Sequence, residues 1–226
     1  MSKTKVMQTQ IAYSRSEELT NIITHAIGAA LSFVGLVFLM LKAVSGDISA
    51  LGVISVFLYG FAVTSVLAAS ALYHAMPYGT RARAVLRRAD HCFVPAVILG
   101  TAAPFAFIGL AGGSYADGVW GYSLFAIIGV IAIASIVLNI ADANAFKIYN
   151  LVGYVLMGWA CVLRMHRIYA LCGGACFWFL TGGCLAYSFG IVFYAIKKLR
   201  FGHAIWHMFV LLGAALNFVS IYTFLL

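Results

Sequence analysis

Apolar residues dominate seven long runs of the chain, and short polar segments separate these runs. Each run is close to the ~20 residues that cross a ~30 Å hydrocarbon core as a helix rising 1.5 Å per residue. The pattern predicts transmembrane helices over Thr20 to Leu41, Ala50 to Ala75, Asp90 to Leu110, Val119 to Ile140, Ile148 to Leu163, Ala175 to Ile196 and His203 to Leu226.

The fifth run is the shortest, because it is confined between Lys147 and Arg164. We therefore expect that Arg164 extends its side chain toward the interface, or that this helix is short or tilted. Glycine and serine residues along the first, fifth and sixth runs predict close packing between helices.

Composition supports this interpretation. The 226 residues are 64% hydrophobic and only 9% charged, and the mean hydropathy is +1.03. These values indicate an integral membrane protein. No polar stretch is long enough for a second domain, so we expect one all-α membrane domain over residues 1–226. The polar segment 1–17 lacks the features of a signal peptide, and we expect it to be a short cytoplasmic N-terminal segment.

The net charge of +8 does not indicate nucleic-acid binding, because the basic residues lie in short loops without interleaved aromatic residues. Their distribution instead predicts orientation. With the N-terminus inside, eleven of the fourteen lysines and arginines lie in inner segments, and only Lys42, Arg164 and Arg167 lie outside. This asymmetry predicts a cytoplasmic N-terminus and an external C-terminus.

The five cysteines show neither zinc-ribbon nor disulfide-scaffold spacing. We interpret them as small buried hydrophobic residues, with a disulfide between Cys172 and Cys176 as the alternative.

Two histidines open the last apolar run. His203 and His207 are four residues apart, so on a helix they project from one face and can bind one metal ion. An ionisable side chain is costly inside an apolar helix unless it faces the protein interior. The alternative is a structural pair that hydrogen-bonds backbone carbonyls.

The predicted topology brings further polar residues to the same depth. The start of the first, third and seventh helices and the end of the second all face the cytoplasm. Five of the six histidines and one aspartate lie at these helix ends: His25, His74, Asp90, His91, His203 and His207. His166 lies on the outer side and is excluded from the site.

Three neutral imidazoles with one open position form the usual zinc site that activates water. We predict that His74 is the third ligand beside His203 and His207, because it ends the neighbouring second helix. Three imidazoles favour Zn²⁺ over iron or manganese, although ligand type alone does not distinguish them.

Two other residues are candidates for catalytic roles. Asp90 could orient the water or take its proton, or it could instead form an interfacial salt bridge with Arg87 or Arg88. Ser70 lies one turn before His74 and could hydrogen-bond the water or a substrate carbonyl. A serine in a membrane helix more often bonds its own backbone.

Glu18, Asn21 and His25 follow one face at the entry to the first helix. Because metal-bound histidines donate their second N–H to such groups, we expect this stripe to support the metal ligands or to pack helices. The acidic residues could alternatively serve only the helix dipole. On a helix His91 points away from Asp90, so we place it outside the site.

The segments Glu18 to His25, Ser70 to His74, Arg88 to His91 and Gly202 to His207 together resemble the motifs of the bacterial haemolysin III family. That family is the prokaryotic branch of the progestin and adipoQ receptors. The resemblance covers essentially the whole chain. It implies a seven-helix fold with a zinc ion near the cytoplasmic face, bound by His74, His203 and His207, with Ser70 and Asp90 beside the metal-bound water.

The resemblance extends to membrane hydrolases such as the alkaline ceramidases. It therefore implies a zinc-dependent hydrolase in the bacterial inner membrane that cleaves a lipid amide or ester. A non-catalytic sensor or regulator of membrane state is the alternative, and a cytolysin is the third hypothesis. A pore would require a continuous polar stripe, and we find none in the sequence.

Overall fold

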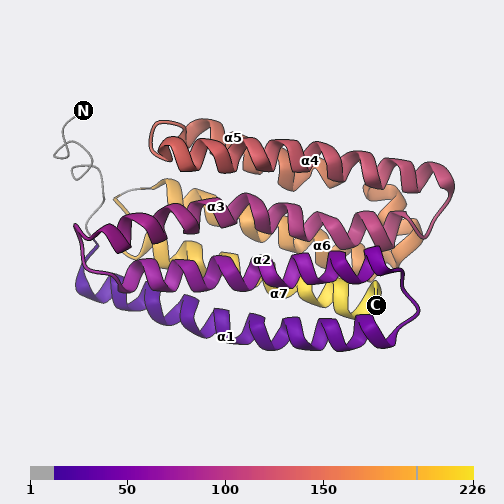
Figure 1. Ribbon diagram of the computed structural model, residues 1–226, viewed down its shortest axis with the longest axis horizontal. Coiled ribbons are helices and arrows are strands. Elements are labelled where there is room, and N and C mark those ends of the chain that lie inside the picture. The colour runs from indigo at the N-terminus through magenta and orange to yellow at the C-terminus, as the bar shows by residue number, and fades with distance from the viewer. Residues whose placement is uncertain (1–12, 197) are drawn as a thin grey trace.

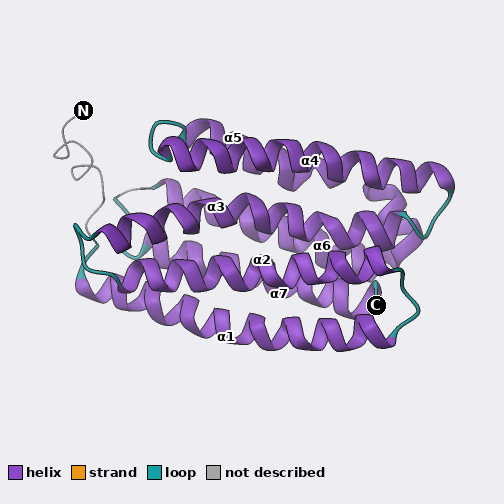
Figure 2. Ribbon diagram, viewed as in Figure 1, coloured by secondary structure: helices purple, strands orange, loops and turns teal. Residues whose placement is uncertain are grey.

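The computed structural model describes residues 13–196 and 198–226, and these residues form a helical bundle without any strand (Figures 1 and 2). Most of the predicted N-terminal segment, residues 1–12, lies outside the described part. The helical elements are α1 (Arg15–Ser45), α2 (Ala50–Ala75), α3 (Arg81–Pro104), the π-helical η2 (Phe105–Leu110), α4 (Tyr115–Asp142), α5 (Lys147–Trp159), the 3₁₀-helical η3 (Ala160–Arg164), α6 (Met165–Ala195) and α7 (Gly202–Phe224).

Six helical segments among the described residues are long and apolar enough to cross a membrane, by length and composition. Five of them contain α1, α2, α3 with η2, α4 and α7. The remaining segment runs from Lys147 to Ala195 and contains α5, η3 and α6 without an intervening loop. The chain is thus an all-α integral membrane protein.

Several helices begin earlier than their apolar runs, because polar residues cap them. Ser14 and Glu17 form a capping box at the start of α1, and the Thr80 hydroxyl accepts a hydrogen bond from the Arg83 amide at the start of α3. The prediction that α3 starts at Asp90 was therefore wrong by nine residues. Asp90 lies inside α3, and His25 lies ten residues into α1, rather than at helix ends.

The predicted outer loop between the fifth and sixth runs is helical. The α5 helix is short, which confirms the expectation of a short or tilted helix in its first form. The α6 helix begins at Met165 rather than Ala175. Arg164 and Arg167 suggested a loop, but both guanidinium groups pair with the buried Asp117 carboxylate. Gly173 interrupts α6 with φ 86° and ψ 161°, a conformation that side chains with a Cβ rarely adopt.

The first and last helices of the chain lie side by side. α1 packs against α2 and α7, while α4 and α5 lie on the opposite side of the bundle beyond α3 (Figure 1). Gly28 of α1 permits this contact, because a Cβ there would lie only 2.3 Å from a methyl carbon of Leu211 in α7. The five cysteines are free thiols, so the structure has no disulfide between Cys172 and Cys176.

Candidate metal centre

The structure brings three of the predicted histidines together. His74 at the end of α2 and His203 and His207 in the first two turns of α7 each offer one ring nitrogen, and these nitrogens lie within 4.8 Å of one another. His74 and His207 are 3% and 1% exposed. His166 is exposed in the first turn of α6 and takes no part in this cluster.

One distance between donor atoms matches that expected around a tetrahedral metal ion. Metal–nitrogen bonds of about 2.0–2.1 Å place two ligands of one zinc ion roughly 3.3 Å apart. The Nε2 atoms of His74 and His203 are 3.1 Å apart. When the Nδ1–H of a neutral His74 bonds Glu18, its Nε2 carries a lone pair, which requires a proton or a cation beside it. The three histidines therefore could hold a metal ion.

A partly buried carboxylate orients the first of these histidines. The His74 Nδ1–H donates to the Glu18 carboxylate over 2.6 Å. Glu18 also accepts hydrogen bonds from the Tyr78 hydroxyl and the Arg83 guanidinium. Such a carboxylate fixes the imidazole ring and its tautomer, which is the supporting role predicted for this residue.

Arg83 links this carboxylate to the end of α2. Its side chain is 1% exposed, and its Nη1 donates to the Met76 carbonyl over 2.6 Å. It thus satisfies a carbonyl just beyond the helix, where no intrahelical donor is left. From its position in the sequence, Arg83 is predicted only to be a loop charge that sets orientation. Neither its burial nor the contact of Tyr78 with Glu18 has a local sequence signal.

The other two members of the α1 stripe also face inward. The His25 ring stacks on the His207 ring, with centroids 3.4 Å apart and planes inclined by 15°. Asn21 is fully buried, and among the described residues its amide atoms have no hydrogen-bond partner. Next to His25, the Thr24 hydroxyl lies 3.4 Å from Nδ1 of His207. The stripe supports the centre through Glu18 and packs it through His25.

Asp90 and Ser70 line the same cavity as His25, His203 and His207. The Asp90 carboxylate lies 3.4 Å from Nδ1 of His91, so the expectation that His91 points away from Asp90 was wrong. The rotamers bring the two adjacent side chains together despite their divergent Cα–Cβ directions. Among the described residues Asp90 forms no salt bridge with Arg87 or Arg88, its alternative partners, and Arg87 instead donates to the Asn144 side chain.

Tyr13 covers the histidines from the N-terminal side. Its ring stacks on His203 with centroids 5.2 Å apart, and its backbone N–H donates to the Tyr78 hydroxyl. Burial raises the pKa of the Tyr13 phenol well above its usual range. Partial burial and the hydrogen bond to Glu18 raise the pKa of Tyr78 to about 12. Both phenols are neutral at physiological pH, and the Tyr78 hydroxyl donates a hydrogen bond to Glu18.

A polar network beside Asp90 ties three helices together. Pro95 lies four residues after His91 and has no N–H, so the His91 carbonyl lacks its helical donor. The Asn139 amide of α4 donates to this carbonyl over 3.0 Å, and the Tyr154 hydroxyl of α5 lies 3.4 Å from it. Asn150 donates to Asn139 over 2.8 Å. A proline four residues after a functional segment could have revealed the unpaired carbonyl, but not its partners.

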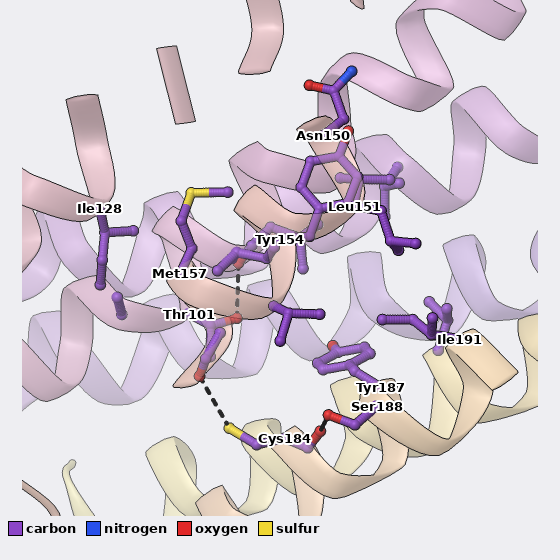
Figure 3. A pocket seen from close by; sticks show the side chains of 18 of the residues that line it. Thr101, Ile128, Asn150, Leu151, Tyr154, Met157, Cys184, Tyr187, Ser188 and Ile191 are labelled. Carbon is purple, nitrogen blue, oxygen red and sulfur yellow. Dashed lines mark hydrogen bonds between the residues drawn. The ribbon is translucent and has the colours of Figure 1, made fainter. Parts of the chain in front are cut away.

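A cavity of about 350 Å³ extends from the histidines into the bundle. Its walls come from all of the helices α1 to α7 and are mostly apolar, as Figure 3 shows around Ile128, Met157 and Ile191. Arg164, Ile168 and Leu110 line it far from the histidines. A mainly apolar cavity with few polar groups is typical of a small-molecule or lipid site.

The bundle and its centre define a class: an all-helical integral membrane protein with buried histidines, able to hold a metal ion, at one end of an apolar cavity. The chain belongs to the haemolysin-III related family, whose sequence profile matches residues 13–218. It is 34% identical over 209 residues to a Hemolysin-3 homolog of Bacillus subtilis (strain 168), covering 92% of this chain and 94% of that protein. It is 33% identical over 210 residues to Hemolysin-3 of Bacillus cereus, covering 93% and 92%.

Proposed function

We propose that the protein is a zinc-dependent intramembrane hydrolase that cleaves a lipid amide or ester. The observation that carries the proposal is the convergence of three imidazoles on one point, with a carboxylate and a hydroxyl in the wall of the adjoining apolar cavity. Zinc held by His74, His203 and His207 would act as a Lewis acid and lower the pKa of a coordinated water molecule.

The residues of the chain have separate roles in this proposal. Glu18 fixes the His74 ring, so that its Nε2 faces the other two imidazoles. Asp90 takes a proton from the attacking water and returns it to the leaving amine or alcohol. The Ser70 hydroxyl donates to the carbonyl oxygen of the substrate, where negative charge develops. The cavity holds the lipid chain and excludes bulk water.

We further propose seven membrane crossings with the N-terminus in the cytoplasm, as the distribution of lysine and arginine favours. In this orientation the histidines lie near the cytoplasmic face of the bacterial inner membrane, and substrates enter from the inner leaflet.

Elemental analysis of detergent-purified protein tests the metal centre. We expect one zinc per chain in wild type and in His166→Ala, the matched control on an exposed histidine. The variants His74→Ala, His203→Ala and His207→Ala should each lose the metal. Carefully handled wild type without any metal would refute the proposal.

Substrate assays test the chemistry. Protein that holds stoichiometric zinc should release fatty acid from some member of a panel of lipid amides and esters, and Asp90→Asn should retain zinc but lose this activity. Zinc-loaded wild type that releases nothing from the panel would contradict the hydrolase.

A regulator of membrane state is the second candidate, because the histidines and Glu18 join α1, α2 and α7 through one point. In that case Asp90→Asn would change neither the metal content nor the output. The Bacillus cereus relative is named Hemolysin-3, so cytolysis is the third candidate. Leakage from liposomes that contain the purified protein would favour it.

A further inference from the structure

The cavity contains polar groups that the proposed hydrolysis does not use. Asn217 of α7 lines it and is 0% exposed. Neither its amide nitrogen nor its amide oxygen has a hydrogen-bond partner among the described residues, and the same holds for the Tyr187 hydroxyl on α6. The two side chains approach one another without forming a good hydrogen bond. A buried amide without partners is costly, which points to a ligand that satisfies it.

The Asn217 amide is held firmly in place. It lies directly on Gly183 of α6, where a Cβ would be only 2.5 Å from the amide oxygen. The Tyr187 ring lies nearly as close over Gly213 of α7, at 2.8 Å from a Cβ built there. Figure 3 shows Tyr187 on the cavity wall opposite Tyr154. The glycines thus let two polar groups reach the cavity between closely packed helices.

The distance between these groups and the histidines sets how far along a bound acyl chain the groups would lie. Asn217 follows His207 by ten residues on α7, which corresponds to about 15 Å along the helix axis at 1.5 Å per residue. This is about half of a ~30 Å hydrocarbon core. An extended acyl chain with its carbonyl at the histidines would place its distal half beside Asn217 and Tyr187.

We infer that the site prefers an acyl chain that carries a hydroxyl group on its distal half, an inference that rests on the proposed function. A hydroxyl group donates to the amide oxygen of Asn217 and accepts from its amide nitrogen or from Tyr187. A keto group could only accept, and a plain hydrocarbon would form no hydrogen bond with Asn217 or Tyr187.

A competition experiment tests this selectivity without requiring hydrolysis. Purified protein is offered equal amounts of the ethanolamide of octadecanoic acid and of its 12-hydroxy derivative, and the bound lipids are quantified by mass spectrometry. We expect wild type to retain the hydroxylated chain about threefold to tenfold more, as one or two neutral hydrogen bonds provide. Asn217→Leu should abolish the preference, and Tyr187→Phe should reduce it.

Thr101→Val is the matched control. Thr101 lines the same cavity (Figure 3), but its hydroxyl already donates to the Val97 carbonyl over 2.8 Å. Its replacement should leave the preference unchanged. Equal binding of the two chains by wild type, or an unchanged preference in Asn217→Leu, would overturn the inference.

Thermal stability gives a second, ligand-free measurement. Because Asn217→Leu removes two unsatisfied polar atoms, the lipid-free variant should melt at a higher temperature than wild type. A lower melting temperature would mean that ordered water already satisfies the amide, and would overturn the inference. Selective binding of the hydroxylated lipid without release of any fatty acid would instead refute only the hydrolase. Equal binding of the two lipids, with fatty acid released from both at equal rates, would refute only the selectivity.

Discussion

Replacement of Asn139 by leucine should destabilise the protein through the carbonyl that Pro95 leaves without a donor. The Asn139 amide donates to the His91 carbonyl over 3.0 Å and accepts from Asn150 over 2.8 Å. In the variant this carbonyl and the Asn150 amide lose their hydrogen-bond partner, although the Tyr154 hydroxyl at 3.4 Å can move closer to the carbonyl. Hydrogen bonds between membrane helices contribute on average about 0.6 and at most about 1.7 kcal/mol each.

With two or three such bonds lost, the cost is about 1 to 5 kcal/mol. For a chain of this size each kcal/mol shifts the melting temperature by about 2 to 4 °C, so we expect a fall of roughly 2 to 20 °C. Tryptophan fluorescence during heating in one detergent measures this. Asn144→Leu is the matched control, because Asn144 is exposed and its loss should change stability by less than about 0.5 kcal/mol.

A second substitution tests whether the unpaired His91 carbonyl is the cause of the lost stability. Pro95→Ala restores the backbone N–H that the His91 carbonyl lacks, so it should recover about 1 kcal/mol of the cost of Asn139→Leu in the double variant. If Asn139→Leu melts within about 2 °C of wild type, or if Pro95→Ala recovers none of the loss, the carbonyl is not the reason for this network.

Three other predictions concern the support of the histidines. Glu18→Gln should weaken zinc binding about 10- to 100-fold, measured by chelator competition, because it removes the carboxylate that orients His74. The control variant Glu17→Gln, which keeps its helix cap, should bind zinc like wild type. Equal zinc affinities of Glu18→Gln and wild type would contradict the role of Glu18. Tyr13→Ala should accelerate metal loss to a chelator, since the ring covers the histidines; an unchanged rate would mean that chelators enter elsewhere. Burial and Glu18 raise the pKa of Tyr78 to about 12. The stability that its neutral hydroxyl contributes should therefore be complete below pH 10 and lost as the pH rises toward 12. Melting curves at alkaline pH should show this loss in wild type and not in Tyr78→Phe.

The three histidines could be predicted from the sequence because helical geometry relates them. The spacing of His203 and His207 fixes their common face within a single helix, and the count of crossings places the end of the second helix at the same depth. The structure accordingly brings His74 to the other two. Predictions of this kind succeed where a local rule and a topological rule agree.

Contacts between helices were not predictable in the same way. Tyr13, Tyr78 and Arg83 join the centre through side chains whose partners lie more than fifty residues away in sequence. The start of α6 was missed because charged residues, Arg164 and Arg167 among them, suggested a loop, whereas both form ion pairs with Asp117 on α4. A single sequence does not show which distant charges will meet.

The positions of the histidines in the chain have a consequence for its synthesis. His74 leaves the ribosome early, but its two partners belong to the last helix, and α7 must pack against α1 and α2 before they meet. A chain truncated before Gly202 can therefore insert most of its helices and still lack the centre. If the three histidines hold a metal ion as proposed, metal retention reports that membrane insertion has reached the final helix, and newly made protein should acquire the ion only after translation ends.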